Sequence, residues 1–362
     1  MRARALAFYL PQFHPVPEND EFWGAGFTEW TNVARARPLF RGHHQPNLPG
    51  ELGFYDLRLA ETRRAQADLA RGHGIEGFVY WHYWFAGRRV LQRPFDEVLG
   101  TGEPDFPFAL AWANQSWTGV WHGAPGRLLI EQTYPGESDH QRHFEAVLPA
   151  LLDPRYVRVD GRPLFIVFRP QELPGAGAFT EQWRALAARA GLPGMFLVGM
   201  DDFDRWDPRS AGFDAVIATR DAYTWAAVGE RFPYRLRHVI NRSEIGGSRW
   251  TLLRPPLLGF PYADQAARLL PKGTPDWDAY PAVVSNWDST PRLGGRGCVW
   301  TGSTPERFAR HVAAALDWLA RYPPERRLLF VKSWNEWAEG NYLEPDRRWG
   351  RAYLEALAGV LS

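Results

Sequence analysis

The chain has 362 residues, enough for one large α/β domain or for two ordinary ones. Its formal net charge is only +1, so it lacks the basic field that attracts nucleic acid or an anionic membrane, and we expect neither partner. A single cysteine, Cys298, excludes an internal disulfide, and no Cys/His cluster has zinc spacing, so we expect no metal, no cofactor and a cytoplasmic protein.

The first predicted element is a strand close to the amino terminus, from Ala5 to Leu10. Two arginines precede this apolar run, as in a signal peptide, but Pro11 ends the run too early for an h-region and no small-residue cleavage site follows. No other segment approaches the ~18 apolar residues that a membrane helix needs. We therefore expect a soluble chain without membrane insertion.

Seven further apolar runs of strand length follow along the chain. Each is short, nearly continuous and bounded by turn residues, which is the pattern of strands buried on both faces of a parallel sheet. In chain order, the eight predicted strands are Ala5 to Leu10, Gly77 to Trp81, Phe108 to Trp112, Leu164 to Phe168, Phe196 to Met200, Ala215 to Ala218, Ala282 to Ser285 and Leu328 to Lys332.

Amphipathic helices are predicted between several of these strands, because apolar residues recur there at helical spacing with start and stop signals around them. They are Leu57 to Arg71 before Gly72, a stripe from Phe144 to Leu152 after a Ser138 N-cap and before Pro154, a stripe from Trp183 to Ala190 closed by Gly191, and Phe308 to Leu319 after Thr304-Pro305-Glu306. A shorter patch of helical periodicity covers Tyr262 to Leu270.

Eight buried strands alternating with helices favour an α/β fold of the (β/α)₈ TIM barrel type, with a doubly wound open sheet as the alternative. The pattern is weakest from Thr219 to Tyr280, where Gly, Pro, Arg and Trp dominate, as in a long strand-to-helix loop. No internal repeat or linker-like stretch divides the chain. We therefore expect residues 1–362 to form a single domain with long loops after its strands.

Aromatic residues make up 15% of the chain, including 18 tryptophans, and several clusters interleave them with polar residues. The clusters are WHYWF (81–85), LAWANQSWTGVWHG (110–123), SNWD (285–288) and SWNEW (333–337). A sugar presents a face of C–H groups and a rim of hydroxyls, so flat rings beside amides and carboxylates suit it. Aromatic residues more often fill cores, but this mixture indicates an oligosaccharide or polysaccharide substrate.

The active site of a barrel forms at the carboxyl ends of its strands, and the interleaved clusters fall there. We therefore predict that the polar and aromatic residues at and after the strand ends, together with two residues of the GFTEW segment, bind substrate. These residues are Tyr9, Gln12, His14, Glu29, Trp30, Trp81, His82, Tyr83, Trp84, Trp112, Asn114, Trp117, Asn286, Asp288, Trp334, Asn335 and Trp337.

Glu336 and Glu339 follow the eighth predicted strand and are the candidate catalytic pair. If the chain turns helically there, their Cβ atoms lie ~5–6 Å apart on one face, and repulsion should raise one pKa. Glycoside hydrolysis generally needs such a pair, one carboxyl as acid and one as base or nucleophile. Two glutamates at this spacing are common on solvated helices, so their position after the strand carries the prediction. Glu344 and Asp346 are expected to be loop carboxylates or to lie just behind the catalytic residues.

Three segments resemble the WbsX-like family of bacterial polysaccharide-cluster proteins: YLPQFHPVPENDEFWGAGFTEWTNV, SNWDSTPR and SWNEWAEGNYLEPD. That family is labelled glycosyltransferase, yet it is similar to the glycoside hydrolase family 99 endo-α-mannosidases and endomannanases. The resemblance implies that Glu336 deprotonates the sugar's own 2-hydroxyl, giving a 1,2-anhydro intermediate, and that Glu339 is the acid and then the base for water. Ala338 stands where the mannosidases usually have histidine, so the resemblance does not fix the sugar or its linkage.

Three functions remain open from the sequence. The first is a retaining glycoside hydrolase, endo-acting on an α-linked, mannose-like bacterial polysaccharide. The second is a glycosyltransferase of O-antigen or capsule synthesis, for which the DxD triplets Asp202-Phe203-Asp204 and Asp276-Trp277-Asp278 are candidate metal motifs, although no Gly-rich phosphate loop follows a strand. The third is a non-catalytic carbohydrate-binding protein. The close histidine pairs, His43-His44 and His140/His143, are expected on the surface or in loops.

Overall fold

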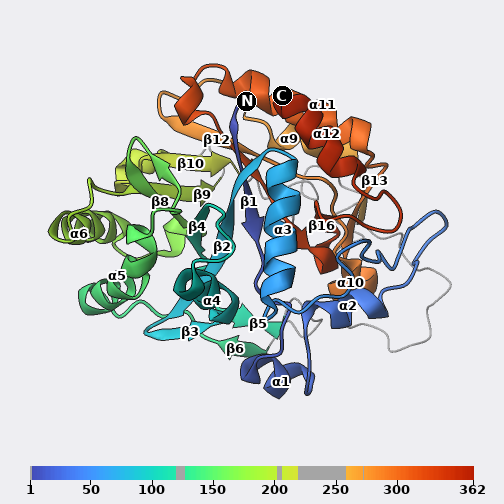
Figure 1. The fold of residues 1–362 in the computed structure, drawn as a ribbon, viewed down its shortest axis with the longest axis horizontal. Helices are drawn as coiled ribbons and strands as arrows, with labels where there is room; N and C mark the ends of the chain where they lie inside the picture. Colours follow the sequence, from blue (N-terminus) through green and yellow to red (C-terminus); the bar gives the residue numbers. More distant parts are fainter. Residues whose placement is uncertain (1, 120–126, 202–205, 219–257, 272) are drawn as a thin grey trace.

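Eight parallel strands close into a barrel in the structure, a computed structural model that describes residues 2–119, 127–201, 206–218, 258–271 and 273–362 (Figure 1). The strands follow one another around the barrel in the order β1, β14, β12, β10, β9, β8, β4 and β2, and β2 pairs again with β1. Helices α3, α5, α6, α11 and α12 lie around the strands. The predicted (β/α)₈ barrel is confirmed, and the open-sheet alternative is wrong.

Each of the eight predicted strands overlaps one barrel strand. The barrel strands are β1 Arg4–Tyr9, β2 Ile75–Phe85, β4 Phe108–Trp112, β8 Arg162–Val167, β9 Phe196–Asp201, β10 Ala215–Ala218, β12 Asp278–Val283 and β14 Leu328–Val331. The seventh was predicted to begin at Ala282 but begins four residues earlier, at Asp278. Pro281 in its middle resembles a turn signal, yet it pairs with Ala218 in the sheet.

The five predicted helices are present as α3, α5, α6, α9 and α11, with differences at two starts, whereas α1, α2, α4, α10 and α12 were not predicted. They are α1 Pro17–Trp23, α2 Glu29–Arg35, α3 Ala60–Gly72, α4 Arg93–Thr101, α5 Glu137–Leu152, α6 Ala176–Arg189, α9 Tyr262–Leu269, α10 Thr290–Leu293, α11 Pro305–Leu319 and α12 Ala352–Leu361. Leu57 lies before α3, because its N–H donates to the Phe13 carbonyl (3.2 Å). Ser138 is not the N-cap of α5; Gly136 is.

Short strands lie outside the barrel wall. They are β3 Arg88–Val90, β5 Trp117–Thr118, β6 Leu128–Ile130, β7 Arg158–Val159, β11 Leu258–Pro261, β13 Cys298–Thr301, β15 Asn335–Glu336 and β16 Asn341–Tyr342. Of the weakly patterned stretch from Thr219 to Tyr280, residues 219–257 lie outside the described part of the chain, and its one predicted helical patch is α9. Among the described residues, no helix combines the length and apolarity that crossing a membrane requires.

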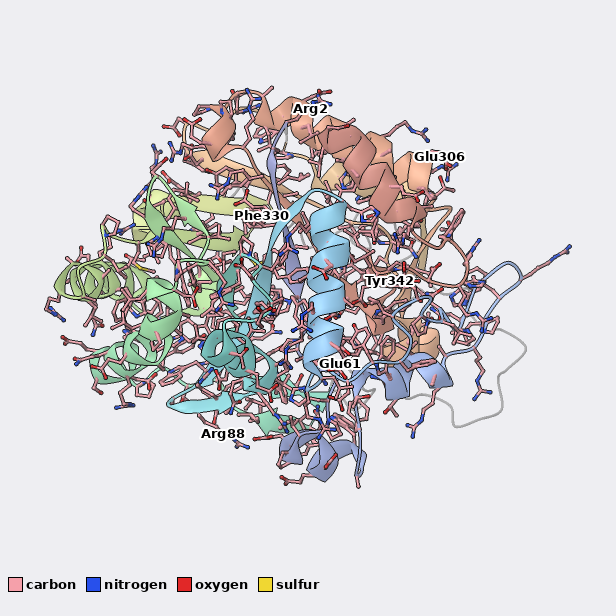
Figure 2. The ribbon with its side chains drawn as sticks, viewed as in Figure 1. Arg2, Glu61, Arg88, Glu306, Phe330 and Tyr342 are labelled. Atoms are coloured by element: carbon pink, nitrogen blue, oxygen red, sulfur yellow. The ribbon has the colours of Figure 1, made fainter. Side chains whose placement is uncertain are left out.

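Aromatic rings fill the barrel interior. Phe8 of β1 stacks on Trp81 of β2 with ring centroids 4.9 Å apart, and Trp81 meets Phe168, beyond the end of β8, edge to face (5.4 Å). Phe330 of β14 is fully buried in the centre of the molecule, whereas Arg2, Glu61 and Glu306 lie at its surface (Figure 2). Burying these rings removes a large apolar area from water, which stabilises the closed barrel.

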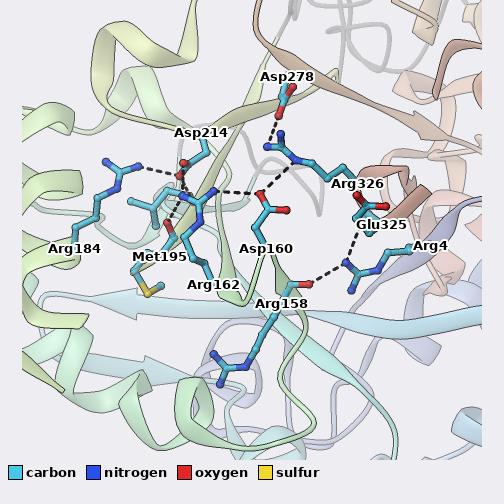
Figure 3. A network of polar contacts seen from close by, with 11 residues as sticks. Arg4, Arg158, Asp160, Arg162, Arg184, Met195, Asp214, Asp278, Glu325 and Arg326 are labelled. Atoms are coloured by element: carbon cyan, nitrogen blue, oxygen red, sulfur yellow. Dashed lines mark hydrogen bonds and ion pairs between the residues drawn. The ribbon is translucent and has the colours of Figure 1, made fainter. Parts of the chain in front are cut away.

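Ion pairs link strand starts at the amino-terminal end of the barrel (Figure 3). Asp214, just before β10, accepts from Arg162 of β8 (2.7 Å) and Arg184 of α6 (2.9 Å). Asp278 of β12 accepts from Arg326 (2.7 Å). In TIM barrels this end supports stability, whereas the carboxyl ends of the strands carry the chemistry.

Candidate active site

The segment after β14 turns back on itself and presents Glu336 and Glu339. The Ser333 hydroxyl oxygen accepts hydrogen bonds from the backbone N–H groups of Asn335 (3.1 Å) and Glu336 (2.9 Å), which starts the turn. Strand β15 then pairs antiparallel with β16, and a single 3₁₀ turn, Trp337–Glu339, joins them. The predicted helical turn is therefore wrong in type, because the β15 and β16 pairing leaves room for only one tight turn.

Gly340 allows this turn for two reasons. Its φ of +59° lies in the left-handed region, which strains most side chains. In addition, a Cβ at this position would lie 2.7 Å from the Cβ of Asp288, so any larger residue would push the two segments apart. The close approach is fixed by the Asp288 N–H, which donates to the Glu339 carbonyl (2.6 Å).

Three buried carboxylates converge on one arginine, Arg292, in α10. Its Nη2 lies 2.9 Å from Glu336 and its Nη1 lies 2.5 Å from Glu339. Its Nε donates to Glu29 (2.8 Å), and Nη2 also contacts that carboxylate. Each of these four side chains is less than one tenth exposed, so their charges interact with little screening by water.

Burial and mutual repulsion raise the pKa of two carboxyl groups in this cluster. The pKa of Glu339 is raised to about 7, first by burial and then by the negative charge of Glu336, against the opposing effect of Arg292. Burial also raises the pKa of Glu29. Burial alone would lower the pKa of Arg292, but the carboxylates together raise it. Near neutral pH, Glu339 can therefore both hold and release a proton, as a general acid and base must.

Asp288 holds the segments that carry Arg292 and Glu339. Its Oδ1 accepts from the Thr290 backbone N–H (3.0 Å) and hydroxyl (2.6 Å) at the start of α10. Its Oδ2 is bonded to His43 Nε2 (2.7 Å) and Gln45 Nε2 (2.6 Å) from the loop before α3. This carboxylate is occupied by protein donors, so the structure places Asp288 as a positioning residue for the cluster.

Glu344 forms a second buried acid site beside the first. It accepts from the Trp337 ring N–H (2.6 Å), the Gln66 amide (2.6 Å) and the Tyr55 hydroxyl (2.8 Å). Burial raises the pKa of Glu344 to about 7, although these donors act in the opposite direction. Trp337 in turn stacks on Tyr342, with ring centroids 3.8 Å apart. Through its hydrogen bond with Trp337, Glu344 holds the turn that carries Glu336 and Glu339.

Tyr83 and Trp117 lie near the carboxylate cluster, among the residues predicted to bind substrate. Burial raises the pKa of Tyr83, and Glu336 raises it further, which places the phenol within electrostatic reach of the cluster. Trp117 is half-buried and meets Tyr83 edge to face (5.4 Å). Trp81 instead lies deeper, stacked on Phe8 inside the barrel.

His82, Trp84, Trp112 and Asn114 do not join the cluster. The first two alternate with Trp81 and Tyr83 along β2, so they face the surrounding helices rather than the barrel axis. His82 bonds His143 of α5 (2.9 Å), and Trp84 stacks on the same imidazole (4.8 Å). Trp112 meets His143 edge to face, and Asn114 bonds the Arg169 backbone. These contacts place the four side chains in the wall of the barrel rather than in the carboxylate cluster.

The remaining predicted residues surround the site or lie behind it. Four of them contact groups behind the site. Tyr9 donates to Gln66 (2.7 Å), Asn335 bonds the Leu10 backbone, Trp30 donates to the Tyr55 carbonyl and Trp334 packs on Phe78.

The other three lie outside the cluster. The Gln12 carbonyl accepts a hydrogen bond from the Glu29 N–H. The buried His14 ring has no hydrogen-bond partner among the described residues, and Asn286 lines a separate cavity. Most of the remaining predicted side chains therefore contact other groups of the protein.

Arg292 is the main residue of the candidate site that the sequence analysis missed. The signal was present in SNWDSTPR, where an arginine follows a strand end and the Thr-Pro start of a short helix. However, its role depends on Glu29, 263 residues away, and on Glu336, 44 residues away. Sequence spacing alone could not bring these groups together.

One of the two histidine pairs is placed differently from the prediction. His44 is exposed and His43 is buried, but both lie in the loop before α3 as predicted, whereas His140 and His143 are buried in α5, so a surface or loop position was wrong for that pair. Burial lowers the pKa of His143 well below its usual value, which keeps it neutral. Within the described ranges, no group of three or more His, Cys, Asp or Glu side chains is arranged to hold a metal ion.

Comparisons with known proteins give a family and a fold. The family described as "Glycosyltransferase WbsX" matches residues 5–357. The chain is 37% identical over 363 residues to "Uncharacterized protein WxcX" of Xanthomonas campestris pv. campestris, strain B100, and to the same protein of strain ATCC 33913. These matches cover 99% of this chain and 50% of the relatives, so the chain spans about half of their length.

Two solved structures share the fold at low identity. A "Glycoside hydrolase-like protein" superposes with a TM-score of 0.59 at 16% identity, covering 99% of this chain and 94% of the other. A GH99 endo-α-mannosidase from Bacteroides thetaiotaomicron superposes with a TM-score of 0.53 at 15% identity, covering 99% and 96%.

Proposed function

The chain belongs to the WbsX family, and we propose that it is a retaining glycoside hydrolase, endo-acting on an α-linked, mannose-like bacterial polysaccharide. Membership makes it part of a family of carbohydrate-active enzymes, and hydrolysis is the finer assignment that we propose. The observation that carries it is the meeting of Glu336 and Glu339 on one buried arginine, with the pKa of Glu339 raised to about 7. Because the relatives are twice as long, the activity of a whole protein of that length is part of the proposal.

The proposed reaction begins with an attack inside the sugar. The Glu336 carboxylate removes the proton of the 2-hydroxyl, O2 bonds to the anomeric carbon, and the glycosidic C–O bond breaks. Glu339 donates its proton to the departing oxygen, so the first product leaves as an alcohol. A 2-hydroxyl on the ring face opposite the leaving group, as in α-mannosides, permits this attack.

The second half of the reaction returns both carboxyl groups to their starting states. Glu339, now ionised, removes a proton from water as that water attacks the anomeric carbon of the 1,2-anhydro sugar. The bond from that carbon to O2 breaks, and O2 takes back the proton that Glu336 holds. Two displacements at one carbon retain its configuration, and water is the only reactant added.

Arg292 supports the assignment of these roles through its charge. Arg292 donates a hydrogen bond from Nη2 to the Glu336 carboxylate (2.9 Å), which holds that carboxylate in place for its proposed role as the base. The same cation opposes protonation of Glu339, and burial outweighs it there. Glu339 can therefore begin with the proton that its role as the acid requires.

Glycosyl transfer is the second candidate, favoured by the description of the family. Of the two DxD triplets, Asp202-Phe203-Asp204 lies outside the described residues. The other, Asp276-Trp277-Asp278, lies at the start of β12, where Asp276 pairs with Arg209 and Asp278 with Arg326. That position is at the opposite end of the barrel from Glu336, which speaks against a nucleotide–metal site there.

One experiment separates hydrolysis, transfer and binding without turnover. The purified chain is incubated with bacterial O-antigen and capsular polysaccharides, and new reducing ends are measured with and without nucleotide sugars; nucleotide-sugar binding is followed by calorimetry. Hydrolysis predicts new reducing ends without any nucleotide sugar. Chain growth that depends on a nucleotide sugar would establish the transferase instead, and binding without either reaction would establish a lectin-like protein.

A further inference from the structure

A polar cavity of about 150 Å³ lies beside the carboxylate cluster but is not part of it. Its wall comes from the loop before α3, the segment after β12, β13 with the two residues that follow it, and the segment that includes and follows β16. Asp288 and Gly340 line it, and both lie next to the cluster, because Gly340 directly follows Glu339 and the Asp288 N–H donates to the Glu339 carbonyl. Pockets that enclose a whole small-molecule ligand usually measure ~300–1,000 Å³, so this volume suits one unit of a longer ligand.

The lining of the cavity combines flat rings with free polar groups. Trp349 is half-buried and packs edge to face on Tyr353 (6.0 Å), which leaves part of its ring open. Phe40 is 38% exposed, a high value for a phenylalanine. The Asn286 amide oxygen is buried and has no hydrogen-bond partner among the described residues. A buried acceptor without a partner is costly, and a bound hydroxyl would satisfy it.

Charged groups in the cavity divide into occupied carboxylates and an available cation. The Asp346 carboxylate accepts from the Tyr342 hydroxyl (2.8 Å) and from the backbone N–H groups of Arg348 and Trp349. Arg348 is exposed, and its guanidinium lies 5.1 Å from the centre of the Trp349 ring. Among the described residues, Arg348 makes no ion pair. The groups left for a ligand are therefore a ring face, an amide oxygen and guanidinium donors.

His43 and Asp288 resemble a catalytic dyad, but their hydrogen bonds exclude that role. His43 Nδ1 accepts a hydrogen bond from the Leu39 backbone N–H (3.1 Å), so this nitrogen carries no hydrogen. Nε2 must then carry it and donates to Asp288 (2.7 Å). Neither nitrogen is free to take a proton from a ligand, so the chemistry of the cavity is binding rather than a second reaction.

We propose that this cavity binds one sugar unit of the polysaccharide, near the unit that is cleaved. The Trp349 ring would face the C–H side of the sugar, while Asn286 and Arg348 bind its hydroxyls. The proposal takes its class of ligand from the proposed function, but it requires binding only and not turnover. A unit held here anchors the chain beside the Glu336 and Glu339 turn.

The test uses full-length Glu339→Gln protein on an array of bacterial O-antigen and capsular polysaccharides. Adding Trp349→Ala or Arg348→Ala should each weaken binding about tenfold, since each loses one sugar contact. Trp277→Ala is the matched control, because Trp277 is also half-buried beside an arginine (Arg209, 5.4 Å) but lies at the opposite end of the barrel. Thermal melting checks the fold, and Arg348→Ala, an exposed change, remains informative if Trp349→Ala does not fold.

The outcomes separate the cavity from the reaction. Unchanged binding in both variants, an equal loss in Trp277→Ala, or no polysaccharide bound at all would overturn the proposal. If wild-type protein releases reducing ends while Trp349→Ala binds and cleaves normally, the proposed sugar binding in the cavity is wrong and the proposed hydrolase activity is supported. If the cavity variants lose binding but wild-type protein cleaves nothing that it binds, the proposed hydrolase activity is wrong and the proposed sugar binding in the cavity is supported.

Discussion

Glu339 and Glu344 lie five positions apart, and both have a pKa raised to about 7 by burial, yet their surroundings differ. Glu344 accepts hydrogen bonds from three neutral donors, which lie in the loop before α3, in α3 and in its own turn. Glu339 shares a guanidinium with two other carboxylates. A raised pKa is therefore common to both sites and does not distinguish chemistry from support.

The kind of partner makes the difference. Neutral donors hold Glu344 in one place, and any change in its protonation leaves Trp337, Gln66 or Tyr55 poorly bonded. In the other site, Arg292 can balance a proton moving between Glu336 and Glu339, because it contacts both. We infer that Glu339 serves the reaction and Glu344 the fold, and each prediction below contrasts the two sites.

The largest expected effect comes from the catalytic pair. Glu336→Gln should remove the 2-hydroxyl base and Glu339→Gln the acid, each lowering kcat by about 10³-fold or more. Initial rates of reducing-end release measure this, and thermal melting confirms that the fold is kept. A variant that retains a tenth of wild-type kcat would remove that residue from the mechanism.

Arg292→Lys should reduce kcat/KM by about 10²-fold. A lysine places one compact charge where the guanidinium bonds three carboxylates at once, so the pair loses its alignment. The matched control is Arg209→Lys, because Arg209 also bridges two carboxylates, Asp207 and Asp276, at the other end of the barrel. Equal losses of activity in both variants would show that general destabilisation is the cause.

The pH dependence of activity should follow Glu339. Its protonated form is the acid, so kcat/KM should fall about tenfold for each pH unit above about 7. A pH–rate profile with the same substrate measures this limb. Activity that stays constant to pH 9 would contradict the role of Glu339 as the acid.

The pH dependence of stability should reflect both acids. Their folded-state pKa values of about 7 exceed the ordinary value of 4.5, so between these values the unfolded chain binds fewer protons than the folded chain. As far as these groups are concerned, stability should therefore be greatest below about pH 4.5 and should fall as pH rises to about 7. Urea unfolding midpoints at pH 5 and pH 7.5 measure the slope, which Glu344→Gln should reduce.

The smallest effect on rate is expected from Glu344→Gln. The new amide group would turn an N–H toward hydrogen-bond donors, which should lower the free energy of unfolding by about 2 kcal/mol. The turn that carries Glu336 and Glu339 should still form below the melting temperature of the variant protein, so kcat should change by less than about threefold. A loss as large as that of Glu339→Gln would abolish the distinction between the two acids.

The sequence predicted what depends on local pattern. The eight strands are continuous apolar runs, and burial on both faces of a parallel sheet requires such runs. Glu336 and Glu339 follow the last run directly, so their position at the site could also be predicted. The one shifted strand contains Pro281, whose usual meaning is a turn, although the barrel accepts it within β12.

What the sequence could not supply is the direction of each side chain. WHYWF is aromatic at nearly every position, so alternation along β2 does not reveal that Tyr83 faces the cluster while His82 and Trp84 face α5. Arg292 meets Glu29 only because the barrel closes and brings distant segments together. Contacts of this kind are set by tertiary packing rather than by local spacing.

The most direct test of the central claim is the configuration of the first product formed by the wild-type chain. Proton NMR of the anomeric signals, recorded before the released sugar equilibrates, distinguishes the α from the β reducing end. Two displacements at one carbon, driven by Glu336 and Glu339, predict an α-configured reducing end from an α-linked polysaccharide, without any nucleotide sugar. A β-configured first product, or no released end unless a nucleotide sugar is present, would contradict the account.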